Sequence, residues 1–116
     1  MALTKDQIFF AKDAETVSFD VPEWGGSILL RPMTGKQRAE YEHWASQASK
    51  NDNDFRTIRE RTILACAVDD SGEALFTFDD LEKLAEKNSL VLDRVSEECQ
   101  KISGLLASSV EDAAKN

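Results

Sequence analysis

One short segment near the N-terminus constrains the fold of this chain more than any other. Apolar and polar residues alternate from Val17 to Val21, which is the two-residue period of a strand with one buried face. Residues 22–26 read Pro-Glu-Trp-Gly-Gly, and paired glycines allow the positive φ angles of a tight turn. Residues 27–31 are again rich in strand-forming side chains, and a proline ends them. We therefore predict a β-hairpin within residues 16–33.

The chain after the hairpin follows the 3.6-residue period of helices. Thr34 is a predicted N-cap with Gln37 at the capping-box position, and Tyr41 and Trp44 share one face of the helix that follows. A second helix is predicted from a cap at Asp54. Its second half, residues 63–68, is apolar on nearly every side, so we expect it to be central and buried.

Two further helices are predicted, one that begins after a cap at Thr77 and a last one that spans Leu90 to about Ser103. A short helical segment is also predicted ahead of the hairpin, between Thr4 and Lys12. The predicted class is mainly α (α+β), with about four helices and an N-terminal β-hairpin. A chain of 116 residues is enough for one domain. We place that domain at residues 1–106 and expect residues 107–116 to form a flexible tail.

The charge balance excludes several classes of partner. The chain has 14 basic and 22 acidic residues, a net charge of −8. This argues against nucleic-acid binding, which needs a positive surface, and against docking on anionic membranes. The sequence contains no apolar run near the roughly 18 residues of a membrane span.

No constellation of catalytic or metal-binding residues is recognisable. His43 is the single histidine and has only Glu40 at a helical spacing where it would orient the imidazole. Cys66 and Cys99 both lie in apolar helical patterns, which favours two buried thiols, although a disulfide between them stays open. The acidic turn at residues 69–73 lacks the full pattern of a calcium loop. We expect no enzyme activity, no cofactor and no metal.

Two segments carry a family resemblance. Residues 17–26 read Val-Ser-Phe-Asp-Val-Pro-Glu-Trp-Gly-Gly, and residues 28–35 read Ile-Leu-Leu-Arg-Pro-Met-Thr-Gly. This succession of strand, turn, strand and helix start resembles the tail assembly chaperones of long, flexible-tailed bacteriophages, the small proteins of the lambda G type. The remaining pattern is compatible, so the resemblance covers about residues 17–106.

The resemblance implies a non-enzymatic role in the cytoplasm of an infected bacterial host. Such chaperones coat the long tape measure protein, keep it soluble and help recruit tail tube subunits, and they are absent from the finished virion. A small acidic protein that binds in many copies would cover exposed apolar stripes and bind through avidity. A coat on a long rod places copies side by side, so we also expect self-association.

The resemblance identifies no residue-level site, so the partner-binding candidates come from the sequence. Trp24 beside the predicted turn either folds onto the core or faces a partner, and the apolar area of the indole favours the core. Basic residues on the first two long helices form either a solvated face or a small positive patch, with Arg61 pointing away from its neighbours. The candidates are Trp24, Arg38, Tyr41, Arg56 and Arg59.

The last residues suggest how the tail tube protein would be recruited. Many members of the resembling family have a longer form made by a programmed ribosomal frameshift. Lys115 and Asn116 can be encoded on a slippery A-AAA-AAY heptamer, which would give this chain an extended product. The gene sequence decides this, since a GCG or AAG codon there would break the heptamer.

Other functions fit the same composition. A structural head-tail connector or tail-completion protein of a phage would share the size and would persist in purified virions. An acidic mimic of DNA is disfavoured because acidic and basic residues alternate, as in Glu60-Arg61 and Glu82-Lys83.

Overall fold

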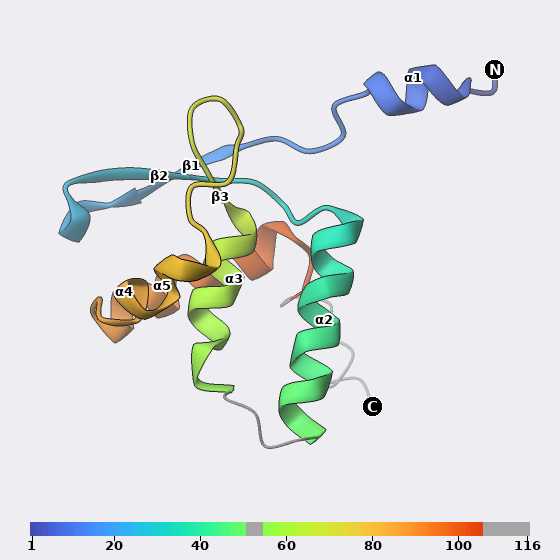
Figure 1. Cartoon of the computed structure of the whole chain (residues 1–116). Helices are drawn as coiled ribbons and strands as arrows, with labels where there is room; N and C mark the ends of the chain where they lie inside the picture. The colour runs from blue at the N-terminus through green and yellow to red at the C-terminus, as the bar shows by residue number, and fades with distance from the viewer. Residues whose placement is uncertain (51–54, 106–116) are drawn as a thin grey trace, which may run out of the picture.

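The computed structural model describes residues 1–50 and 55–105, which form a small antiparallel sheet and a set of helices (Figure 1). The strands are β1 (Val17–Val21), β2 (Gly26–Leu30) and β3 (Ala67–Val68). The α-helices are α1 (Lys5–Phe10), α2 (Gly35–Lys50), α3 (Ile58–Cys66), α4 (Leu81–Ala85) and α5 (Ser89–Ile102). Three 3-10 turns, η1 (Pro22–Trp24), η2 (Phe55–Thr57) and η3 (Phe78–Asp80), complete the described part. The predicted class, mainly helical with an N-terminal hairpin, is confirmed.

The hairpin forms where the alternating pattern predicts it. β1 pairs with β2 in an antiparallel register from Val17 opposite Leu30 to Val21 opposite Gly26. Gly25 closes the turn with a φ of +83°, a conformation that a side chain would strain. Val21 and Leu30 are fully buried, so the apolar face of the hairpin lies on the core.

The end of the second long helix was predicted wrongly. The sequence pattern continues the helix through residue 68, but α3 ends at Cys66, and Ala67 and Val68 form β3 beside Leu30 and Leu29. Arg31 N–H donates to the Cys66 carbonyl at 2.9 Å, which holds the end of α3 against the sheet. A short apolar run is equally compatible with a buried helix turn and a buried strand, and only the partner strand decides between them. The predicted burial of residues 63–68 holds for Ile63, Cys66, Ala67 and Val68.

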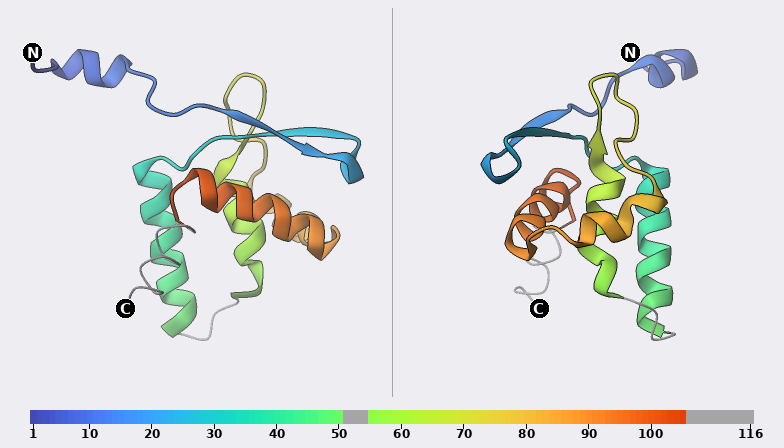
Figure 2. Two further views of the ribbon diagram at one scale, coloured as in Figure 1. Left: turned by 180° about the vertical axis from the view of Figure 1, so that it is seen from behind. Right: turned by 60° about the vertical axis from the view of Figure 1, so that its left-hand side comes forward.

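The core lies between the hairpin, α3 and α5. The figures show α5 under one face of the hairpin and α3 beside it, with α2 packed along the other side of α3 (Figures 1 and 2). The apolar residues of the core come from the hairpin, α3, β3, α4 and α5, namely Val21, Ile28, Leu30, Ile63, Cys66, Ala67, Leu84, Val91, Leu92, Val95 and Cys99. Cys66 and Cys99 are both buried and free, as two packed thiols. The hydrogen bond with the neighbouring Cys66 thiol, followed by burial, raises the pKa of the Cys99 thiol.

Several helix ends confirm the predicted caps. Thr34 Oγ1 accepts from Gln37 N–H at 3.1 Å, and Gln37 Oε1 accepts from Thr34 N–H at 2.9 Å. Thr77 and Asp80 make a similar reciprocal pair before α4, and Gly104, with a φ of +75°, follows the last helix. The predicted cap at Asp54 lies outside the described residues.

The N-terminal helix α1 stands away from the rest of the molecule. It forms with a capping box between Thr4 and Gln7, but none of its residues is buried. Figure 2 shows it at the end of an extended segment, beyond the body of the domain. The side chains of Ile8, Phe9 and Phe10 are therefore exposed. Among the described helices, none has the combined length and apolar character required to cross a bilayer.

Candidate partner-binding site

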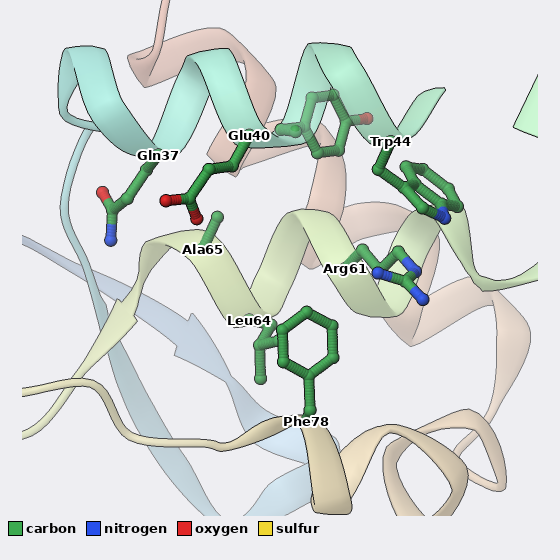
Figure 3. A pocket seen from close by; sticks show the side chains of 8 residues that line it. Gln37, Glu40, Trp44, Arg61, Leu64, Ala65 and Phe78 are labelled. Carbon is green, nitrogen blue, oxygen red and sulfur yellow. The ribbon is translucent and has the colours of Figure 1, made fainter. Parts of the chain in front are cut away.

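An apolar hollow of about 160 Å³ opens between α2, α3 and the start of η3. We call it the aromatic hollow, because rings from α2 and η3 form two of its walls (Figure 3). The side chains of α2 that line it are one helical turn or so apart, which places them on the face turned toward α3. Its lining residues are Gln37, Glu40, Tyr41, Trp44, Arg61, Leu64, Ala65 and Phe78.

Arg61 lies at one end of the aromatic hollow, between two of its rings (Figure 3). Its guanidinium carbon is 4.6 Å from the centroid of the Trp44 ring and 5.2 Å from that of the Phe78 ring. Both distances are within the range of cation–π attraction. Arg61 Nε also donates to Thr57 Oγ1 at 3.0 Å, which fixes the stem of the side chain along α3. The cation therefore joins aromatic rings from α2 and η3 across α3.

Tyr41 also lines the aromatic hollow, and two contacts hold its ring in position. Its hydroxyl is hydrogen-bonded to the Thr62 hydroxyl at 3.0 Å, and its ring centroid is 6.0 Å from that of Trp44 at a tilt of 47°. Tilted ring pairs at this distance are favourable. The two rings of α2 are thus held before any partner arrives, which lowers the ordering cost of binding.

Phe78 is the exposed wall of the aromatic hollow. It is 65% exposed, although it sits in a capped turn between Thr77 and Asp80. A large ring left in water beside an apolar hollow gains from burial against a partner. Glu40 and Gln37 add polar groups at the opposite end from Arg61 (Figure 3). The apolar lining and the exposed ring of Phe78 suit an apolar side chain of a partner.

A second hollow, of about 380 Å³, lies at the edge of the sheet. β3 covers only Leu29 and Leu30 of β2, and on its other side Val68 forms a bridge with Ala74 as the chain returns. We call this space the sheet-edge hollow. Its lining residues are Trp24, Ser27, Ile28, Leu29, Val68, Asp69, Asp70, Leu75 and Phe76.

The rim of the sheet-edge hollow carries negative charge. Asp69 Oδ1 accepts from Ser71 Oγ at 2.6 Å, from Ser71 N–H at 2.8 Å and from Glu73 N–H at 3.1 Å. The Ser71 hydroxyl and these backbone donors hold the pKa of the Asp69 carboxyl below its ordinary value. Asp69 is therefore ionised at neutral pH, with the exposed Asp70 next to it.

The structure separates the predicted partner-binding residues. Trp24 is half-buried, packs against the core as expected, and lines the sheet-edge hollow, whereas Tyr41 lines the aromatic hollow. Arg38 pairs with Glu42 within α2 at 3.3 Å, and Arg59 of α3 pairs with Asp93 of α5. Arg56 is exposed and lies in η2 rather than on the same α-helix as Arg59. Lys115 and Asn116 lie outside the described residues.

Sequence reasoning missed the role of Arg61, which lies between two rings of the aromatic hollow. Arg61 is predicted to point away from the other basic residues. In the structure its guanidinium lies between the rings of Trp44 and Phe78. The spacing of Arg61, Leu64 and Ala65 at i, i+3 and i+4 was a usable signal for a shared face. The ring of Phe78 gave no local signal, because its place in the hollow depends on where the turn at residues 69–77 returns to α3.

Within residues 1–50 and 55–105, no group of three or more His, Cys, Asp or Glu side chains is placed to hold a metal ion. His43 is exposed on α2.

The fold belongs to a structural class that known proteins share. No protein-family model matches the sequence, and no curated protein matches it significantly. The chain is similar to the solved structure of the tail assembly chaperone of bacteriophage HK97, with a TM-score of 0.58 and 20% sequence identity. The match covers 84% of this chain and 90% of the HK97 chain. At 20% sequence identity, the match shows that the two chains have the same fold.

Proposed function

We propose that this protein is a tail assembly chaperone of a long-tailed bacteriophage. The observation that carries the proposal is the fold match to the HK97 tail assembly chaperone over nearly the whole of both chains. The hairpin and helix-start motifs of residues 17–35 support the same family independently of the structure.

The proposed client is the tape measure protein of the same phage. A long helical protein exposes apolar stripes until the tail tube forms around it. The aromatic hollow is suited to such a stripe, since Tyr41 and Trp44 are already fixed and Phe78 is exposed. The chain's net charge of −8 would keep a coated client in solution by mutual repulsion of the copies.

The proposed cycle ends with release. Many weak contacts along one client bind through avidity and are displaced when tube subunits compete for the same stripe. A frameshift-extended form would bring the tail tube protein to the complex, and the chaperone would be absent from the mature virion. The work would take place in the cytoplasm of the infected host.

Co-expression with the tape measure protein tests this function. We expect that protein to be insoluble alone and soluble in a complex that survives affinity purification. Phe78→Glu should lower the recovered complex several-fold, because it places a charge where an apolar side chain is to bind. Leu90→Glu is the matched control, since Leu90 is 73% exposed at the start of α5 and lines neither hollow.

Two outcomes would contradict the proposal. The tape measure protein could stay insoluble in the presence of this chain, or the chain could be found in purified virions in stoichiometric amount. The second result would favour a head-tail connector or tail-completion protein.

A further inference from the structure

The N-terminal arm, residues 1–12, is the most exposed apolar part of the described chain. Phe10 is 87% exposed, and the neighbouring Phe9 and Ile8 are exposed as well. Three consecutive residues of a helix cover about 200° of its circumference, so no single flat contact would bury all of them. The arm therefore requires a concave partner surface.

The helix in this arm is too short to be stable by itself. It contains six residues, and isolated helices shorter than about 12 residues are marginal in water. The reciprocal hydrogen bonds of Thr4 and Gln7, at 2.9 and 3.2 Å, satisfy two backbone groups but bury no apolar area. A preformed cap with an exposed apolar surface is the pattern expected of a segment that becomes stable on docking.

Charge identifies the kind of surface that the arm fits. Residues 1–12 contain Lys5 and Lys12 against Asp6, a net charge of +1. Because the whole chain has 14 basic and 22 acidic residues, the remainder has 12 against 21 and a net charge of −9. The positive charge of the arm is thus complementary to the negative charge of the body, in its own chain or in another copy.

The sheet-edge hollow combines the two properties that the arm requires. Its floor is apolar, with the half-buried Trp24 and Leu29 and with Leu75, which is 44% exposed. Its rim carries the ionised Asp69 and the exposed Asp70. By contrast, the aromatic hollow already contains a cation, Arg61, and is the smaller of the two.

The direction in which the arm leaves the body indicates that the arm filling a sheet-edge hollow comes from a second copy of the chain. The arm leaves the body from the Val17 end of β1, whereas Trp24 lies at the other end of the hairpin. Figure 1 shows α1 and the β1–β2 turn on opposite sides of the molecule. The six residues 11–16 can span at most about 20 Å. They lie beside residues 31–35 of their own chain, on the side of the molecule opposite the β1–β2 turn (Figure 1).

We propose that the arm of one copy docks in the sheet-edge hollow of a second copy, with Phe9 and Phe10 on its apolar floor and the lysines beside Asp69 and Asp70. The contact joins two different surfaces, so it is compatible both with a closed pair that exchanges arms and with a head-to-tail row of copies. It deepens the self-association that the proposed chaperone requires, but it involves no residue of the client.

Cross-linking between two differently tagged full-length variants tests the contact. One copy carries Phe10→Cys and the other carries Leu75→Cys, and a short bismaleimide joins thiols that lie close together. The native Cys66 and Cys99 are buried, so they do not compete. We expect a covalent dimer with both tags. A copy with Leu90→Cys in place of Leu75→Cys is the control and should give little of it.

A charge exchange on the same assay tests the rim. Asp70→Lys in the acceptor copy should lower the dimer yield by up to about fivefold. The double variant Lys5→Glu, Lys12→Glu in the donor copy should restore it. Asp70 is exposed, whereas the Asp69 carboxylate holds the turn by hydrogen bonds, so the fold should tolerate the change at Asp70.

Three results would overturn the proposal. A mixed-tag dimer no more abundant than with the Leu90→Cys control would exclude the contact. A cross-link that forms only when both substitutions are in one chain would place the arm on its own body. A cross-link that requires added tape measure protein would make the arm a client-binding element. Since none of these assays measures client solubility, failure of the proposed function would leave them unaffected.

Discussion

The β1–β2 hairpin and the N-terminal arm are both encoded by short local motifs, yet only the hairpin is held by the rest of the molecule. The hairpin pairs in a fixed register and buries Val21, Ile28 and Leu30 on α3 and α5. The arm has a complete capping box and buries nothing. The comparison shows that a strong local signal specifies a conformation, whereas packing determines whether that conformation contributes to the stability of the domain.

The hairpin and the arm should differ most in how the loss of an apolar side chain changes the free energy of unfolding. Leu30→Ala should lower the free energy of unfolding by about 2–5 kcal/mol, because a fully buried side chain leaves a cavity between the hairpin and α5. Phe10→Ala removes a larger side chain and should leave that free energy unchanged in dilute solution. Urea denaturation of both variants measures the contrast. A comparable loss in Phe10→Ala would mean that the arm packs on its own domain.

The capping boxes of α1 and α2 allow a more closely matched comparison, because Thr4 and Thr34 make the same pair of hydrogen bonds. Thr34→Ala should lower the free energy of unfolding by about 1 kcal/mol, since α2 unfolds together with the domain. Thr4→Ala should not change it. The comparison would fail if both variants shifted the urea midpoint equally.

The smallest effect concerns pH and the tip of the hairpin. Arg94 of α5 donates to both carboxylate oxygens of Glu23, one at 3.0 Å, and this bond holds the pKa of Glu23 below its ordinary value of 4.5. A lowered pKa in the folded state adds stability above the unfolded pKa, and this is lost as pH falls through the folded value. The exposure of both groups keeps the effect small.

Glu23→Gln isolates that contribution. Its melting temperature should lie slightly below that of the parent protein near pH 7, and the difference should vanish as the pH falls well below 4.5. Glu97→Gln, at an exposed glutamate of α5, is the control variant. A difference that persisted unchanged in acid would show that Arg94 does not act through the charge of Glu23.

Much of the local structure was predictable because its causes are local. The alternation of residues 17–21, the Gly25 turn and the caps at Thr4, Thr34 and Thr77 each depend on a few adjacent residues, and each forms as predicted. The end of α3 was predicted wrongly because Ala67 and Val68 are apolar in either conformation, and the choice depended on Leu29 and Leu30 across the sheet.

The candidate site was only partly predictable for the same reason. Tyr41 and Trp44 were expected on one helix face, and both line the aromatic hollow. Phe78 reaches that hollow only because the loop from the end of β3 returns its ring to Arg61. The partner roles of Trp24, Arg38, Tyr41, Arg56 and Arg59 stay predictions.

The sequence by itself determined the hairpin, the helix starts, the buried thiols and the acidic surface of this protein, because periodicity, capping and charge act over a few residues. Only the tertiary structure decided that Ala67–Val68 is a strand, that Arg61 lies between two rings, and that the arm buries none of its apolar side chains. Those features depend on contacts between segments distant in the chain, and no local pattern specifies which distant segment will be the neighbour.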